Sequence, residues 1–327
     1  MTETLTGLVG DVGGTNARFA LAHVRAGAIT IDEPKALPAA DYPKAEDAVR
    51  AFLKGLKDED RPRFAVIAAA GPIEDGTVTF TNNTAWRFSE RDLERDCGLA
   101  GVRLINDFAA QALAIDHLKA SELHRIGPPG QPEARATAAI VGPGTGFGAA
   151  AQVDDGVSKA ILTGEGPHAA FAPVDEVEMD IVRFLMKRFG RVSIERLLSG
   201  PGLLNLYEAL ADIQGEKAAC ARPDEVTDQG LAGDPLAKAA LSRFCAMLGS
   251  VAGDFALAYG ARRGVYIAGG IAPRILAFLE ASDFRDRFEA KGRMSDYMKA
   301  IPTLVVTAPY SALTGSASLL ADLERQA

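Results

Sequence analysis

The sequence has few cysteines, and they follow no pairing pattern. Cys97, Cys220 and Cys245 are odd in number, lie far apart and fall outside any C-x-x-C motif. Thiols of this kind are typically reduced and mostly buried, so we expect neither a disulfide framework nor a structural zinc site.

The sequence also lacks a long apolar run and an excess of positive charge. No apolar run reaches the length of a bilayer, and the opening residues MTETLTG have neither the basic start nor the apolar stretch of a secretion signal. The formal net charge is -8, whereas a nucleic-acid partner normally requires a basic face. We therefore expect a cytoplasmic protein that binds neither a membrane nor nucleic acid.

Length and pattern together predict a two-lobed α/β protein. At 327 residues the chain exceeds the usual size of a single core, so a second lobe and a cleft between the lobes are expected. The first part alternates strands with helices: a hairpin with a glycine tip (5–24), a helix (41–56), a buried strand (64–71), and a strand-to-helix junction at LINDF (104–108).

The second part repeats the opening pattern. Residues 136–162 predict a strand, a glycine-rich turn and two further strands, and residues 264–276 predict a strand, a glycine turn and a helix. Between them, SIERLLSGPG (193–202) predicts a helix that begins at Ser193 and carries Glu195 in its first turn.

Three glycine-rich turns offer bare backbone amides, which suit the oxygen atoms of a phosphate. Beside the first turn, Asp11 could hold Mg²⁺ through water and Arg18 could neutralise phosphate charge. Taken one at a time, each turn is also explained by tight hairpin geometry, and Arg18 by a surface ion pair. The predicted phosphate-binding positions are Gly13, Gly14, Thr15, Gly142, Gly144, Thr145, Gly146, Gly269 and Gly270.

Two familiar loop motifs do not account for these turns. GPGTGFGA (142–149) contains G-x-G-x-x-A, close to the dinucleotide fingerprint, and Glu165 follows about twenty residues later. That fingerprint must open a helix, whereas the residues after it predict a β-hairpin with a DDG turn. The P-loop pattern G-x-x-x-x-G-K-[ST] does not occur.

Several polar residues suit a sugar site. Asn106 and Asp107 stand where a strand ends and a helix begins, which is where α/β sheets display functional groups, and Asp107 could accept a hydroxyl proton there. A helix cap explains this pair equally well, the helix dipole explains Glu195, and a structural hydrogen bond explains His168. Together with Glu165, however, they supply the carboxylates, amide and imidazole that the hydroxyl groups of a hexose require, without metal-ligand spacing.

The combination resembles the bacterial glucokinase family, which are ATP-dependent hexokinases of the actin-like ATPase (ribonuclease H-like) superfold. The resemblance runs in order from about residue 8 to residue 320 and is carried by LVGDVGGTNARFAL, LINDFAAQALAI, GPGTGFG, GEGPH, VSIERLLSGPGLLNLYEAL and GVYIAGGIAPRIL. It implies mixed sheets flanked by helices, a small lobe of residues 1–107 and 301–327, a large lobe of 108–300, and usually a homodimer.

By this resemblance the chain transfers the γ-phosphoryl group of MgATP to the 6-hydroxyl of glucose, with ATP and Mg²⁺ as cofactors. The first glycine turn, including Asn16, and GPGTG would be the phosphate loops, and Ile271 with its neighbouring glycines would lie by the adenosine. Asp107 matches the catalytic base. The positions that match sugar contacts in the family are Asn106, Asp107, Glu165, His168 and Glu195.

One departure from the family concerns the GEGPH loop. The family usually reads GEGGH, and this chain has Pro167 there, with Ala170 where Asp is frequent. Proline fixes its φ at about -65° and biases Gly166 toward an extended backbone. We therefore expect this loop to differ in shape from that of the family, which leaves the identity of the preferred sugar open. A kinase for another hexose and a sugar-sensing protein without catalysis therefore remain alternatives.

Overall fold

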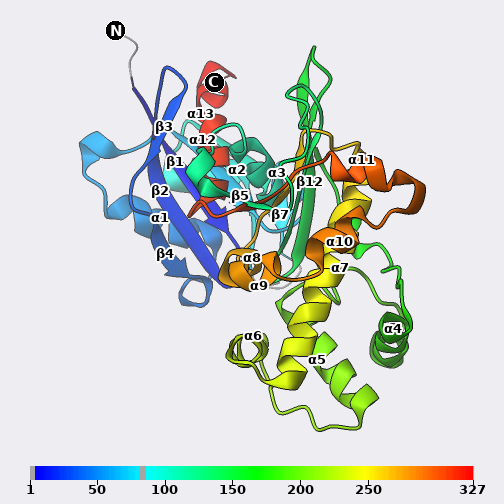
Figure 1. The fold of residues 1–327 in the computed structure, drawn as a ribbon. Coiled ribbons are helices and arrows are strands. Elements are labelled where there is room, and N and C mark those ends of the chain that lie inside the picture. Colours follow the sequence, from blue (N-terminus) through cyan, green and yellow to red (C-terminus); the bar gives the residue numbers. More distant parts are fainter. Residues whose placement is uncertain (1–3, 81–85, 327) are drawn as a thin grey trace. The chain divides into compact units, whose positions relative to one another are not determined.

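The computed structural model describes residues 4–80 and 86–326. The chain forms two compact units, one made of Met1–Ala120 and Ala308–Ala327 and the other of Ser121–Thr307 (Figure 1). Each unit contains a six-stranded mixed sheet flanked by helices, which confirms the predicted α/β class.

The first unit is built on a sheet of strand order β3-β2-β1-β5-β9, with β4 paired to β2, and on a small sheet of order β6-β7-β8. Strands β1 and β2 form the predicted hairpin, with Leu5 opposite Val24. The elements of this unit are β1 (Leu5–Val12), β2 (Asn16–Arg25), β3 (Ala28–Ile31), β4 (Lys35–Pro38), α1 (Ala45–Lys54), β5 (Phe64–Ala69), β6 (Ile73–Glu74), β7 (Thr77–Thr79), β8 (Arg87–Ser89), α2 (Glu90–Cys97), β9 (Gly101–Asn106), α3 (Asp107–Ala114), α12 (Ser311–Ser318) and α13 (Leu320–Gln326).

Both faces of this sheet are covered, so every residue of β5 is buried. One face carries a cluster that includes Phe19, Phe52 and Phe88, and the other packs against the C-terminal helices through Leu313 and Leu320. The chain's last residues therefore complete the first unit, even though about two hundred residues separate them from β9.

The second unit is built on a sheet of strand order β10-β15-β14-β11-β12-β13. Strands β11 and β12 are antiparallel, with Gly142 opposite Gly148, and β12 also pairs antiparallel with β13. The elements are β10 (Leu123–Ile126), β11 (Ala138–Pro143), β12 (Phe147–Asp154), β13 (Lys159–Thr163), α4 (Glu176–Phe189), α5 (Gly200–Gln214), α6 (Pro223–Ala232), α7 (Pro235–Tyr259), β14 (Gly264–Ile267), α8 (Ile271–Arg274), α9 (Leu276–Glu280), α10 (Phe284–Glu289), α11 (Ser295–Lys299) and β15 (Thr303–Val306).

Helix α7 is the core helix of the second unit, and α5, α6 and α10 pack against it (Figure 1). By length and composition alone it could cross a membrane, although no apolar run of that length was expected from the sequence. In its most apolar window 72% of the helix is buried inside the protein, and small residues such as Gly249 let α10 approach closely. A buried core helix satisfies the same length criterion, so α7 is weak evidence for a membrane span.

The compact units end later along the chain than the predicted lobes. Helix α3 packs on α12, where a Cβ on Gly315 would lie 1.8 Å from the carbonyl oxygen of Ala110, so α3 belongs to the first unit. Strand β15 pairs with β14 and β10, so it belongs to the second. The division into functional lobes at 107 and 300 stays a prediction.

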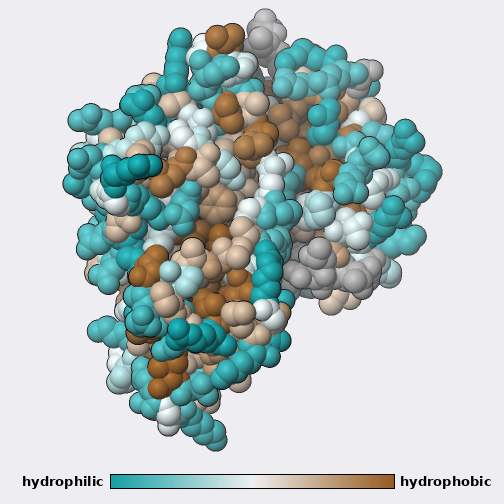
Figure 2. Space-filling model, turned by 90° about the vertical axis from the view of Figure 1, so that its right-hand side faces the viewer, coloured by the Kyte–Doolittle hydropathy of each residue, from teal (hydrophilic) through white to brown (hydrophobic). Residues whose placement is uncertain are grey.

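On the face shown in Figure 2, hydrophilic residues are interspersed with apolar residues that gather in separate patches. Among the described residues, the most exposed large apolar side chain is Val157, 95% exposed in the turn after β12, and Met186 on α4 is half exposed. Exposed apolar residues on different elements do not identify an interface by themselves, so the homodimer remains a prediction.

The three cysteines are free thiols, as the sequence predicts. Burial raises the pKa of the Cys97 thiol from 9.0 to about 11 and that of Cys245 to about 12. Because only the thiolate reacts, a pKa raised from 9.0 to about 11 leaves about a hundredfold less thiolate at pH 8.

We expect iodoacetamide to alkylate Cys97 in the native protein about 100 times more slowly than in urea, with the rate rising about tenfold per pH unit up to pH 10. Equal native and denatured rates at pH 8 would contradict this.

Candidate functional site

In the first unit, the parallel strands β1, β5 and β9 bring two predicted site segments to one edge of the sheet. Val12 is in register with Ala69, and Ala69 with Asn106. Two strand spacings, about 10 Å, therefore separate the end of β1 from the end of β9. The first glycine turn and the Asn106–Asp107 pair follow these two ends directly, as expected for functional groups of an α/β sheet.

The first glycine turn is a tight hairpin tip. The Gly13 N–H donates to the carbonyl of Asn16 at 2.9 Å, and the Thr15 carbonyl accepts the Ala39 N–H at 2.9 Å. Opposite each other close to this tip, Arg18 Nη1 and Asp11 Oδ2 lie 3.6 Å apart. The ion pair considered for Arg18 is therefore present, and it places a cation beside the carboxylate at the phosphate-loop candidate.

Asp11 has the chemistry required of a magnesium-binding carboxylate that acts through water. Burial raises the pKa of its carboxyl group, and the Arg18 guanidinium opposes that rise, as any further cation would. Within the described residues no three His, Cys, Asp or Glu side chains are grouped to hold a metal. A single carboxylate still fits Mg²⁺, which keeps several waters and takes its remaining ligands from substrate phosphates.

Asn106 and Asp107 differ in what they do for helix α3. Asn106 is the N-cap, because its Oδ1 accepts the N–H groups of Phe108 at 2.9 Å and Ala109 at 3.2 Å. Asp107 Oδ1 accepts the Phe108 N–H at 2.9 Å, a group that Asn106 also accepts. Capping therefore explains Asn106, whereas α3 does not need the carboxylate of Asp107 for its cap.

In the second unit, the glycine turns after β11 and β14 are in contact. The two strands are parallel, and a Cβ on Gly142 would lie 2.2 Å from the carbonyl oxygen of Ala268. Gly269 has φ +82°, and its Cβ would lie 2.4 Å from the carbonyl oxygen of Pro143. Because β12 and not a helix follows the GPGTG turn, the dinucleotide fingerprint is excluded, as the sequence predicts.

The segment 191–200 corrects one sequence expectation. Ser193 caps no helix; it pairs in an isolated bridge with Ala170, and Glu195 lies in a turn. Helix α5 begins at Gly200, where Ser199 Oγ accepts the Gly202 N–H at 3.0 Å. By their hydroxyl chemistry alone, Ser193 and Ser199 are equally suitable helix caps. The bridge to Ala170 holds Ser193 in an extended segment, so the helix begins after Ser199. The sequence signal for this start is the proline at position 201, in the first turn of α5.

The start of α5 adjoins the GPGTG turn, which the sequence did not predict. The Gly200 N–H donates to the Gly144 carbonyl at 2.8 Å. An α-helix N-terminus carries unpaired N–H groups and a partial positive charge, so this position favours a phosphate in the adjoining loop. Ser199 and Gly200 are thus candidate phosphate-site residues that the sequence prediction missed.

The GEGPH loop forms a single 3₁₀ turn at Gly166–His168. The prediction of an extended backbone at Gly166 is wrong, because glycine has no Cβ to clash with the following proline and can enter the 3₁₀ turn. Glycine also fits the packing at this position, since an added Cβ would lie 2.8 Å from the Phe255 ring. Pro167 is buried, whereas the side chains of Glu165 and His168 are more than half exposed and lie 3.5 Å apart. The loop therefore presents a carboxylate and an imidazole side by side.

Glu195 connects this loop to the GPGTG turn. Its Oε2 accepts the Phe147 N–H at 3.0 Å, and its own N–H donates to the Pro167 carbonyl at 3.1 Å. The Arg191 guanidinium donates to the His168 carbonyl from the same segment. The second unit thus brings together the three sugar-site residues predicted in it and one predicted phosphate loop.

Five glycines in these segments are not required by the fold. They have no left-handed φ, and an added Cβ would meet no atom closer than 3.6 Å. Among the glycines whose surroundings the structure describes, these five alone combine the two properties, and all stand in or beside predicted ligand loops: Gly13, Gly144, Gly164, Gly200 and Gly270. Neither backbone conformation nor crowding therefore requires glycine at these positions, and a backbone left bare in this way would allow a ligand to approach closely.

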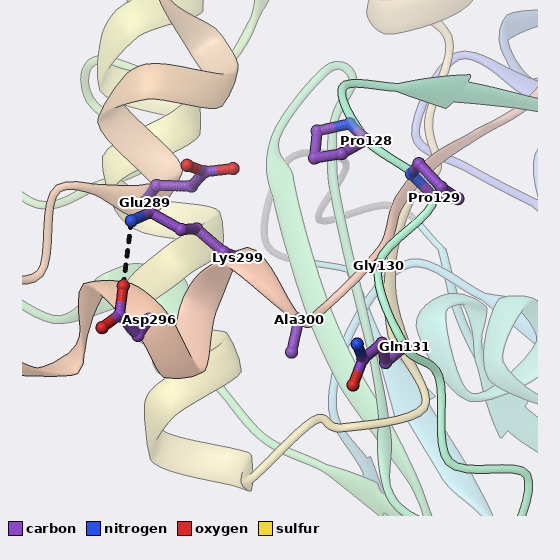
Figure 3. Close-up of a pocket in the computed structure, with 8 residues that line it drawn as sticks. All are labelled: Pro128, Pro129, Gly130, Gln131, Glu289, Asp296, Lys299 and Ala300. Atoms are coloured by element: carbon purple, nitrogen blue, oxygen red, sulfur yellow. Dashed lines mark hydrogen bonds and ion pairs between the residues drawn. The ribbon is translucent and has the colours of Figure 1, made fainter.

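A cavity of about 540 Å³ lies elsewhere in the second unit (Figure 3). The 128–131 segment forms one wall, and the Lys299–Asp296 ion pair and Glu289 stand on the other. None of the predicted site residues lines it. The cavity therefore gives no support to a sugar or nucleotide site at that position.

The two units, with their sheets and glycine turns, have the fold of sugar kinases in the actin-like ATPase superfold. A glucokinase family model matches residues 8–323, and a glucokinase from Caulobacter sp. (strain K31) is 53% identical over 313 residues, which cover 95% of this chain and 94% of that protein. The chain belongs to the glucokinase family, and it is a glucose-phosphorylating kinase. The resemblance seen in the sequence is thereby confirmed.

Solved structures agree with this assignment. A glucokinase from an Antarctic psychrotroph has a TM-score of 0.85 and 38% identity, and the match covers 97% of this chain and 99% of that one. A ROK family glucokinase from Streptomyces griseus, solved with glucose and AMPPNP, has a TM-score of 0.66 at 19% identity, covering 98% of this chain and all of that one, and supports the fold. Neither a kinase for another hexose nor a non-catalytic sugar sensor is favoured by these comparisons.

Proposed function

We propose that this kinase transfers the γ-phosphoryl group of MgATP to the 6-hydroxyl of glucose and that Asp107 is its general base. The five glycines that the fold does not require carry the proposal, because they keep the backbone open in the three glycine turns, in the GEGPH loop and at the start of α5. The glucose and AMPPNP named for the Streptomyces griseus structure support the same pair of substrates.

Each unit supplies part of the proposed chemistry. In the first unit, the amides of the 13–16 turn hold phosphate oxygens, Arg18 offsets their charge, and Asp107 accepts the proton of the attacking hydroxyl. In the second, the 142–146 loop and the start of α5 hold the remaining phosphates, and the third glycine turn with Ile271 lies by the adenosine. Mg²⁺, held through water at Asp11, would supply further charge neutralisation.

The sugar is held by hydrogen bonds to its hydroxyl groups. We assign these to Asn106 and Asp107 in the first unit and to Glu165, His168 and Glu195 in the second. Carboxylates accept hydrogen bonds from hydroxyl groups, and an amide and an imidazole can both donate to and accept from them. We further propose that the enzyme works in the cytoplasm as a homodimer, as expected from the family resemblance.

A panel of hexoses tests the choice of sugar. We expect the highest kcat/KM for glucose in an assay that couples ADP formation to NADH oxidation, with mannose, fructose and glucosamine at least tenfold lower, because hydrogen-bonding sites leave groups unpaired when a hydroxyl is moved or replaced. Tenfold preference for another hexose would contradict the assignment. Glucose binding without ATP consumption would instead indicate the sensor.

A further inference from the structure

Glu195 lies at a junction between the loop of residues 165–168 and the loop of residues 142–146. Given the proposed function, these loops bind the sugar and the phosphates of ATP. We propose that Glu195, besides contacting the sugar, couples the binding of the sugar to the binding of the nucleotide.

The contacts of Glu195 reach both loops at once. Its side chain accepts the Phe147 N–H at the end of the 142–146 loop at 3.0 Å, and its backbone N–H donates to the Pro167 carbonyl at 3.1 Å. Its carbonyl accepts the Ser199 hydroxyl at 2.8 Å, one residue before Gly200 bonds to the phosphate loop. Movement of either loop therefore changes the position of the carboxylate that is assigned to the sugar.

Gly144 and Gly146, the two glycines of the GTG sequence, differ in whether an added Cβ would meet Glu195. A Cβ on Gly146 would lie 2.5 Å from Glu195 Oε2, although the φ of Gly146 is outside the left-handed region. A Cβ on Gly144 would have its nearest neighbour at 4.0 Å. A Cβ at position 146 therefore has to displace the Glu195 carboxylate, whereas one at position 144 does not, so alanine at 144 and 146 gives a pair of variants in one loop.

Coupling between two sites is reciprocal and typically changes affinity by about 5- to 150-fold. We expect a saturating non-hydrolysable ATP analogue to tighten glucose binding at least about fivefold in the wild-type enzyme, as measured by calorimetry. Gly146→Ala displaces Glu195 and should reduce this ratio below twofold while raising the KM for glucose. Gly144→Ala lies in the proposed phosphate loop and should raise the KM for ATP, but once the analogue is saturating it should keep the wild-type coupling ratio.

Three results would overturn the proposal: a wild-type ratio below twofold, equal ratios in the two glycine variants, or a Gly146→Ala enzyme whose KM rises for ATP alone. If circular dichroism shows that Gly146→Ala does not fold, two substitutions of Glu195 test the proposal instead. Glu195→Gln keeps an oxygen that accepts the Phe147 N–H and should keep the coupling ratio, whereas Glu195→Ala should lose it; equal ratios would refute the role. Turnover of glucose by the wild-type enzyme is measured first, so that failure of the proposed function is recognised separately.

Discussion

Replacing Asp107 with asparagine is expected to lower kcat for glucose phosphorylation by a factor of about 10² to 10⁴. The amide has the size and shape of the carboxylate but cannot accept the proton of the sugar hydroxyl. The helix should remain intact, because Asn106 accepts the Phe108 and Ala109 N–H groups and caps α3 without Asp107. Steady-state kinetics with glucose and ATP, together with a thermal melt, measure the two effects separately.

A second capping residue in the same unit provides the control. Ser89 caps α2 by accepting the Asp92 N–H at 3.1 Å, and it stands at none of the positions assigned to substrates. Ser89→Ala should cost about 1 kcal/mol of stability and leave kcat unchanged. The base assignment is refuted if Asp107→Asn keeps more than about a tenth of wild-type kcat, or if its loss of activity follows a loss of folding.

The largest expected effect on stability comes from Arg285. This residue is 8% exposed, and its guanidinium donates to Glu289 Oε1 at 2.6 Å, to the Ile301 carbonyl at 2.9 Å and to Thr303 Oγ1 at 3.2 Å. It also reaches the carbonyl of Met298, so it connects α10 to the end of α11 and the start of β15. Arg285→Ala would remove this donor from the Glu289 carboxylate and from the Ile301 carbonyl.

We expect Arg285→Ala to destabilise the second unit by about 3 to 5 kcal/mol, because removing one partner of a buried pair leaves the other uncompensated. The urea midpoint should fall by about 1 M or more. Arg183→Ala is the matched control: its ion pair with Asp180 is exposed on α4, and we expect no measurable shift. Similar midpoints for the two variants would contradict the role given to Arg285.

Much of the candidate site could be read from sequence because its signals are local. Glycines after apolar strands, a carboxylate at the LINDF junction and the hairpin around GPGTG depend on residues a few positions apart, and the structure confirms the strands and turns that they predict. The order of motifs along the chain was likewise enough to indicate the family. Local patterns could not choose between Ser193 and Ser199 as a cap, because both offer the same hydroxyl chemistry.

Only the tertiary structure decided which distant segments touch. The contact between the Gly142 and Gly269 turns depends on the pairing of β11 with β14, whose residues lie about 125 positions apart. The bond from Glu195 to the Phe147 N–H depends on how the 191–200 segment packs, and no periodicity encodes it. Sequence determined which residues have the chemistry of a sugar kinase, and packing determined which of them act together, because contacts between distant segments are set by sheet register and burial of the whole unit.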